Sequence, residues 1–210
     1  MESDRNESGP VRVRLQELLG PSGPRRGLPA YPFEQVSGPE GQPDRIRIED
    51  IVIEPVGRIR KKKRVDSGSL EGVNTKEVLV HTGDLVLTTL GPQFKCAVID
   101  EENDGAPISE NIVAMTLLSE YSAEYVASYL NSPFGQKELQ NRASGTSHIV
   151  RISPRVLPEV EVCLPPKSMW DEVFELFRTY YGYERVLSRE RETRMKIMDA
   201  LLCTGRGDRP

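Results

Sequence analysis

A pair of prolines, Pro165 and Pro166, divides this chain into two parts with different sequence patterns. After the pair, the segment from Met169 to Leu202 contains no proline and a single glycine. Apolar side chains recur in this segment every three or four residues, which is typical of a helix with one apolar stripe. The stripe consists of Leu176, Tyr180, Tyr183, Leu187, Ile197 and Leu201, with Glu190 and Arg194 as polar interruptions. A stripe on a helix that extends past a globular domain predicts a helical partner. The alternative is a helix folded back onto its own domain.

The sequence before the proline pair favours short strands. Apolar, β-branched runs occupy residues 78–89, where Gly83-Asp84 joins two of them, and residues 96–99, 112–118 and 160–164. Ala123 to Leu130 has the apolar spacing of a short helix, which Pro133 prevents from continuing unbroken. The predicted fold class is α+β. It comprises a mostly β domain with short helices at residues 45–166, a long helix at residues 167–202 and a disordered tail at residues 203–210.

The first 44 residues differ from the rest in their density of proline and glycine. Pairs such as Gly20-Pro21 and Gly23-Pro24 favour turns and extended chain over packing. Only Val11 to Leu19 has the pattern of a short helix or strand. We therefore expect residues 1–44 to form a flexible or peripherally attached arm.

Five short motifs follow one another from residue 83 onward. They are Gly83–Gly91, Ile108–Asn111, Tyr129–Ser132, Ala143–Thr146 and Val160–Pro166. In this order and at these spacings, the series resembles the target recognition domain of type I restriction-modification specificity subunits, over about residues 45–202. The resemblance implies a non-catalytic chain that reads double-stranded DNA for a methyltransferase and an ATPase-nuclease. It also implies that S-adenosylmethionine, ATP and Mg²⁺ belong only to the partner subunits.

The resemblance further implies how the chain assembles. In that family, the helix after the Pro-Pro stop belongs to a spacer that pairs with a second helix and holds two recognition domains apart. This sequence has the length of a single copy and no internal repeat. We therefore expect a half-subunit that forms a homodimer through its helix and reads a two-part, symmetric site. A divergent member that serves another defence or modification system is the alternative.

A concentrated basic run is the first candidate DNA contact. It consists of Arg58, Arg60, Lys61, Lys62, Lys63 and Arg64. The formal net charge of −4 is unusual for a nucleic-acid binder, because cationic side chains supply most non-specific affinity. A local basic face can nevertheless bind phosphate on an acidic protein. The alternative is a solvated hairpin loop.

Two polar loops are the candidates for reading bases. In the loop Gly91–Lys95, Gln93 can pair bidentately with adenine and Lys95 can contact guanine or phosphate. The second loop spans residues 141–148 and is small and polar. Its candidate contacts, together with one residue just beyond it, are Arg142, Ser144, Thr146, Ser147, His148 and Arg151. The alternative for each residue is an ordinary polar loop between core elements.

The sequence lacks the motifs of common catalytic sites. It contains no Gly-x-x-x-x-Gly-Lys-Ser/Thr loop, no glycine-rich dinucleotide turn, no His-Glu-x-x-His and no Asn-Pro-Pro-aromatic motif. An acidic cluster at residues 100–104 lacks the carboxylate and lysine pattern of a nuclease, so we interpret it as a solvated turn. We expect catalysis in partner subunits. Two alternatives remain, a protein–protein adaptor that keeps the fold and a divergent nuclease.

Cysteine spacing and hydropathy limit the metal sites and the cellular location that the sequence allows. The three cysteines, Cys96, Cys163 and Cys203, lack metal-ligand spacing, so we expect buried or free thiols and no metal. The chain has no apolar run of membrane-spanning length and no positively charged start followed by an apolar segment. We therefore expect a cytoplasmic protein that does not associate with membranes.

Overall fold

A four-stranded antiparallel sheet organises the domain. The computed structural model describes residues 9–27, 45–60, 79–146 and 149–204. The sheet order is β2 (Arg25–Arg26), β7 (Ile112–Met115), β5 (Leu85–Thr88) and β6 (Cys96–Val98). All four side chains of β5 are buried. Because side chains alternate along a strand, Leu85 and Leu87 join one core cluster while Val86 joins a second. Both faces of the sheet are therefore covered.

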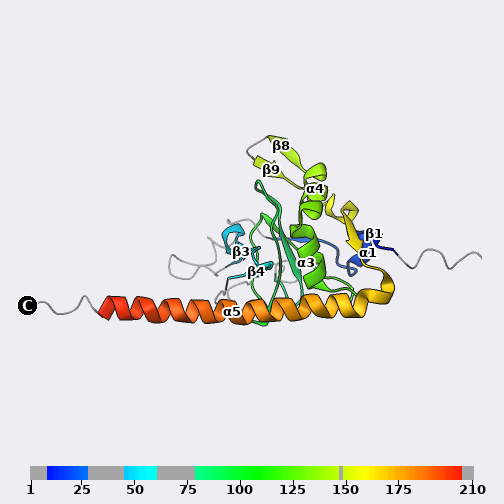
Figure 1. Ribbon diagram of the computed structural model, residues 1–210. Coiled ribbons are helices and arrows are strands. Elements are labelled where there is room, and N and C mark those ends of the chain that lie inside the picture. The colour runs from blue at the N-terminus through cyan, green and yellow to red at the C-terminus, as the bar shows by residue number, and fades with distance from the viewer. Residues whose placement is uncertain (1–8, 28–44, 61–78, 147–148, 205–210) are drawn as a thin grey trace, which may run out of the picture.

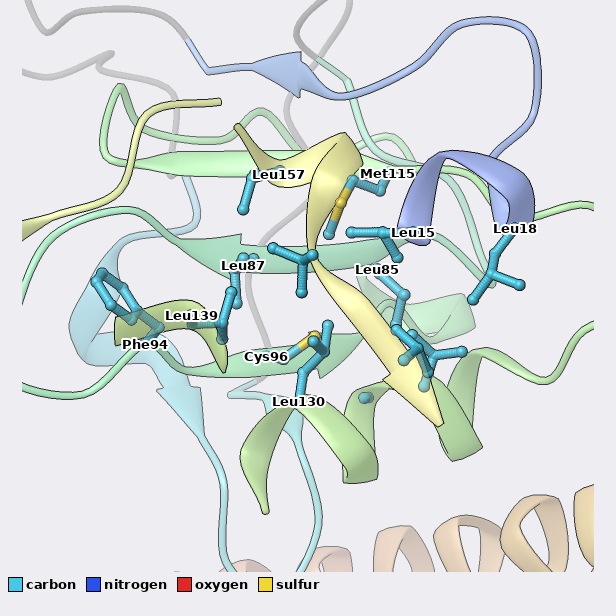
Figure 2. Packing of buried hydrophobic residues seen from close by; sticks show 14 of the residues in the cluster. Leu15, Leu18, Leu85, Leu87, Phe94, Cys96, Met115, Leu130, Leu139 and Leu157 are labelled. Atoms are coloured by element: carbon cyan, nitrogen blue, oxygen red, sulfur yellow. The ribbon is translucent and has the colours of Figure 1, made fainter. Parts of the chain in front are cut away.

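The first face is covered by helices and by one further strand. The covering elements are α1 (Leu15–Leu18), α3 (Ala123–Asn131), α4 (Pro133–Arg142), η5 (Leu157–Glu159) and β10 (Glu161–Leu164). Figure 2 shows Leu15, Leu130 and Leu139 gathered over the sheet with Leu87 and Cys96. The strand β10 alternates half-buried and buried side chains, as its sequence pattern predicts. It pairs antiparallel with β1 (Val11–Arg14).

The second face is covered by the segment from residue 45 to residue 60. This segment contains η1 (Ile48–Asp50), β3 (Ile51–Val52) and β4 (Arg58–Ile59). The strands β3 and β4 pair antiparallel. Ile46, Ile51 and Ile59 pack there against Val86 and Ile108. The acidic turn includes η4 (Glu101–Asn103), and the remaining strands β8 (Ser144–Thr146) and β9 (Ile149–Arg151) form a hairpin.

The helices α3 and α4 meet at a capped corner. Ser122 begins α3, and its hydroxyl accepts a hydrogen bond from Tyr125 N at 3.2 Å. Ser132 separates the two helices, and its hydroxyl accepts from Gly135 N at 3.3 Å. Pro133 occupies the first turn of α4, where a missing amide hydrogen costs nothing. The predicted break at Pro133 is therefore the start of a second helix.

The C-terminal helix α5 (Trp170–Thr204) has 35 residues and follows η6 (Lys167–Met169). It runs along one end of the domain and continues beyond it (Figure 1). Its inner face carries aromatic rings that pack on α3. The ring of Tyr125 lies 5.5 Å from Phe174 and 5.2 Å from Phe177, between centroids, while Tyr181 is buried in the first core cluster. The predicted long helix is present, and its residues as far as Glu192 contact its own domain.

The predicted N-terminal arm is wrong for residues 9–27. Leu15 and Leu18 are fully buried in the first core cluster, and Leu15 N donates to Val160 O at 2.7 Å. The guanidinium of Arg25 pairs with the buried carboxylate of Asp84 at 2.5 Å. These contacts join residues that lie far apart in the sequence, which is why local composition did not reveal them. Residues 1–8 and 28–44 of the predicted arm, and residues 205–210 of the predicted tail, lie outside the described residues.

The predicted strand before Gly83 is also different in the structure. Leu79 makes an isolated bridge with Pro107, and Val80 N donates to Ala106 O at 3.0 Å. This run therefore pairs with the segment after the acidic turn, not with β5. Gly83 has a φ of 88°, a left-handed conformation that favours glycine, so the predicted turn at Gly83-Asp84 is present.

Candidate nucleic-acid interface

The loop Gly91–Lys95 connects β5 to β6 and leaves Pro92 and Gln93 exposed. The neighbouring side chain of Phe94 is fully buried in the first core cluster, beside Leu139 (Figure 2). The Lys95 ammonium donates to Ile51 O at 3.1 Å, so this side chain is directed toward β3. Of the two residues predicted to read bases in this loop, the structure presents Gln93 to solvent and engages Lys95 within the fold.

The predicted second loop is mostly a helix end and a hairpin. Residues 141 and 142 belong to α4, and Ser144–Thr146 forms β8. In the hairpin, Ser144 lies opposite Arg151 on β9, and both residues are exposed. The side chain of Thr146 and the residues Ser147 and His148 lie outside the described residues.

The hairpin and the loop Gly91–Lys95 adjoin each other. Gly91 N donates to Val150 O at 3.1 Å, and Ile152 N donates to Thr89 O at 3.0 Å. Leu90 and Arg151 form an isolated antiparallel bridge. The hairpin lies at the end of the domain opposite α5 (Figure 1). Two segments about 50 residues apart in the sequence are thus joined into one surface, which we call the reading edge and define as residues 91–95, 144–146 and 149–151.

Arg142 occupies a different environment from the one predicted. Its guanidinium pairs with the Glu138 carboxylate one turn earlier in α4. The same carboxylate oxygen accepts from Glu161 N at 3.2 Å, which ties α4 to β10. Arg142 therefore does not lie in a loop that offers its guanidinium to a base. Its partner Glu138 lies four residues away, a spacing that favours ion pairs on helices.

The basic run is divided by the structure. Arg58 on β4 is directed toward α5, where its guanidinium lies 3.9 Å from the Glu192 carboxylate. Arg60 is exposed. Lys61, Lys62, Lys63 and Arg64 lie outside the described residues. Arg58 therefore belongs to the contact between the domain and α5.

The acidic turn is partly solvated, with Glu101 exposed, and it also contacts α5. The Glu102 carboxylate pairs with the Arg189 guanidinium at 2.9 Å. Asp100 caps η4, because its carboxylate accepts from Asn103 N at 3.1 Å. The backbone N–H of Thr82 donates to Asp104 and lowers the pKa of that carboxyl group. Hydrogen bonds and ion pairs thus use these carboxylates within the fold.

Cys96 and Cys163 are both free cysteines. Burial raises the pKa of the Cys96 thiol to about 12, which keeps it protonated and unreactive. Cys163 is half-buried on β10. The described residues include no group of three or more His, Cys, Asp or Glu side chains arranged to hold a metal ion. In the same part of the chain, no helix has the length and apolar character needed to span a membrane.

The apolar stripe predicted on α5 lies away from the domain. Leu176 is 64% exposed, Tyr183 is 60% exposed and Ile197 is 55% exposed, whereas Phe174 on the inner face is 3% exposed. Tyr180 and Leu201 are also exposed, and Leu187 is half-buried. The helix therefore has two apolar faces. The domain covers one of them along the first half of the helix, and the stripe remains accessible.

Two residues near the reading edge were missed as candidates. Asn131 and Gln136 direct their carboxamides at the backbone of residues 96 and 94, respectively. The motif Tyr129–Ser132 contains the first of them, but its sequence does not show which backbone groups the amide meets. Gln136 follows Pro133 by three residues and is only 7% exposed, a burial that a polar residue in α4 does not predict.

Solved specificity subunits of type I restriction-modification systems share the fold of this chain. No protein-family model and no curated protein matches the sequence. Among solved structures, the chain is similar to a type I restriction-modification S subunit from M. genitalium. That match has 14% sequence identity and a TM-score of 0.58, and it covers 95% of this chain and 46% of the other.

A second similar structure is the HsdS subunit from Thermoanaerobacter tengcongensis. This match has 18% identity and a TM-score of 0.55, and it covers 100% of this chain and 54% of the other. The chain therefore spans about half the length of each of these two solved subunits. At such identities the similarity is one of fold. The matches include the N-terminal region, where the expected resemblance began only at about residue 45.

Proposed function

We propose that this chain reads DNA sequence for a restriction-modification or related phage-defence complex. The observation that carries the proposal is the reading edge, where two separate polar segments meet at the end of the domain opposite α5 (Figure 1). Its accessible side chains include the carboxamide of Gln93, the hydroxyl of Ser144 and the guanidinium of Arg151. The likeness to solved specificity subunits supports the fold that such a role requires.

These side chains have the chemistry for two kinds of contact with duplex DNA, one with bases and one with phosphates. A glutamine carboxamide can pair bidentately with adenine in the major groove. Exposed cations such as Arg151 and Arg60 suit phosphate oxygens, which position a protein without identifying bases. In this proposal the lysines at residues 61–63 add further phosphate contacts. Affinity for any duplex should then depend on salt, and discrimination should depend on Gln93.

The stripe on α5 supplies the proposed assembly surface. An exposed apolar stripe with helical spacing is the surface that a second helix covers in a coiled coil. We propose that another copy of this chain supplies that helix, giving two reading edges on one assembly. A methyltransferase subunit, with an ATPase-nuclease in a complete system, would perform the chemistry in the cytoplasm. S-adenosylmethionine, ATP and Mg²⁺ would bind to those subunits, leaving this chain non-catalytic and free of cofactors.

Selection from a random duplex pool tests the proposal directly. The purified chain should enrich one sequence class, and its affinity for that selected duplex should exceed its affinity for the unselected pool. Affinity for both should fall as salt rises, because bound cations release counterions from DNA. A chain that enriches no sequence would refute the role and favour the protein–protein adaptor. Metal-dependent cleavage by the chain alone would instead establish a nuclease.

Two variants distinguish the proposed phosphate contacts from the proposed base contact. Changing Lys61, Lys62 and Lys63 together to Glu should weaken binding to selected and random DNA alike, because ammonium groups contact phosphate. Changing Gln93 to Ala should cost on the order of 1 to 3 kcal/mol on the selected duplex and much less on random DNA. Gln140→Ala, an exposed glutamine on α4, is the matched control and should change neither affinity. If Gln93→Ala lowered the affinity for selected and random DNA equally, Gln93 would not be a base-reading residue.

A further inference from the structure

The edge strand β6 has backbone groups that no neighbouring strand satisfies. It is the last strand of the four-stranded sheet. Thr88 N donates to Lys95 O at 2.9 Å, and Ala97 lies opposite Val86, so the backbones of residues 95 and 97 face β5. Because the direction alternates along a strand, the backbones of Phe94 and Cys96 face away from the sheet. Buried groups of this kind require partners.

Side-chain amides take the place of a missing strand. The Gln136 carboxamide accepts from Phe94 N at 3.1 Å and donates to Phe94 O at 2.7 Å. The Asn131 carboxamide accepts from Cys96 N at 2.8 Å and donates to Cys96 O at 2.8 Å. Each amide thus reproduces one rung of a β-ladder, on residues two apart. We call these two side chains the carboxamide clamp.

The clamp is itself held by the corner between α3 and α4. Gln136 Nε2 makes a second hydrogen bond, to Leu130 O at 2.7 Å, which links the clamp to the end of α3. The Ser132 hydroxyl donates to Tyr129 O at 2.6 Å. A Cβ at Gly135 would lie 2.2 Å from Tyr129 O, so the two helices approach too closely for any other residue there. The corner therefore fixes both amides relative to the core.

We propose that Asn131 and Gln136 are positioning residues for sequence reading, because they fix the loop that presents Gln93. This inference rests on the proposed function. Gly91 is held by Val150 at one end of the exposed pair, and Phe94 is held by Gln136 at the other. Only Pro92 and Gln93 lie between the two fixed points, and the ring of Pro92 restricts its own backbone. A side chain already held in its binding conformation loses less entropy when it binds.

Matched substitutions on the same helices test the clamp. Gln136→Met keeps the length of the side chain but leaves Phe94 N and O without the amide, and Gln140→Met places the same change on the exposed face of α4. Amide hydrogen exchange at Phe94 is the first readout. In Gln136→Met the exchange should accelerate by on the order of tenfold or more relative to both wild type and Gln140→Met, because local opening becomes easier.

DNA binding is the second readout and separates positioning from general stability. The ratio of affinity for the selected duplex to affinity for the random pool should fall by on the order of tenfold in Gln136→Met. Affinity for the random pool should remain within about twofold of wild type, since phosphate contacts do not depend on Gln93. Asn131→Leu should act in the same direction, with Asn141→Leu on the exposed end of α4 as its control.

A third variant covers the case in which Gln136→Met does not fold. In Gln136→Glu, the new carboxylate still accepts from Phe94 N but donates to Phe94 O only when it is protonated. Protection at Phe94 and the affinity ratio should therefore recover as the pH is lowered. Recovery would support the clamp, and an unchanged affinity ratio in folded Gln136 variants would overturn it. A wild-type chain without any sequence preference would overturn the proposed function itself, and the exchange data would still report whether the amides hold the loop.

Discussion

Replacing Leu15 with alanine should destabilise the domain by about 3 kcal/mol. The side chain is fully buried between the sheet and η5, in a segment where composition predicted an arm. Losing three buried carbon atoms removes about 2.4 kcal/mol of transfer free energy, at about 0.8 kcal/mol for each methylene. The cavity left behind adds to this loss, and buried Leu→Ala substitutions accordingly cost about 2 to 5 kcal/mol.

Urea unfolding of wild type and Leu15→Ala, followed by circular dichroism, measures the difference in free energy. In thermal unfolding of the same two proteins, the melting temperature should fall by roughly 6 to 12 °C, at about 2 to 4 °C for each kcal/mol in a chain of this size. Val11→Ala is the control, because Val11 is 44% exposed on the neighbouring strand β1 and should change stability by less than about 1 kcal/mol. A loss below about 0.5 kcal/mol in Leu15→Ala, typical of a surface position, would refute the placement of α1 in the core.

Three further outcomes are expected. Leu187→Asp combined with Ile197→Asp should convert the assembly to monomers in sedimentation experiments while circular dichroism shows a folded domain; a monomeric wild type would contradict the proposed homodimer. Arg142→Ala should lower the free energy of unfolding by about 1 kcal/mol, because it breaks the pair with Glu138, and should leave the preference for selected over random DNA unchanged. Burial raises the pKa of the Cys96 thiol from 9.0 to about 12, so the unfolded chain loses this proton first as pH rises. The free energy of unfolding should therefore fall between about pH 9 and pH 12 more steeply in wild type than in Cys96→Ala. If the free energies of both proteins fell in parallel with pH, a raised pKa of the Cys96 thiol would be contradicted.

The elements that could be predicted are those whose signals are local. The absence of proline between residues 167 and 204 allowed one long helix, and the structure extends it from Trp170 to Thr204. Alternation in residues 160–164 matched the burial of β10. Pro133 marked the boundary between two helices because a proline ring is tolerated in the first turn of a helix and not in its interior. Each signal acts within a few residues of the position that it specifies.

Tertiary structure decided which candidate side chains remain accessible. Arg142 and Lys95 have the chemistry of base contacts, yet Glu138 and Ile51 O engage them within the fold. The stripe on α5 was visible in the sequence, but spacing alone could not show that Phe174 and its neighbours form a second face against the domain. Local sequence specifies the periodicity of a helix. Contacts with the rest of the chain specify which side of it is covered.

Local patterns in the sequence were enough to predict the strands β5, β6, β7 and β10 and the helices α3 and α5, because turns, prolines and apolar periodicity act over short distances. They did not predict β3, β4, α4 or the hairpin of β8 and β9. Only tertiary contacts place α1 in the core, join Gly91 to Val150 and pair the Gln136 amide with Phe94. These contacts join segments separated by tens of residues. Their stability comes from burying apolar surface and satisfying buried backbone groups, and neither can be evaluated until the chain has folded around them.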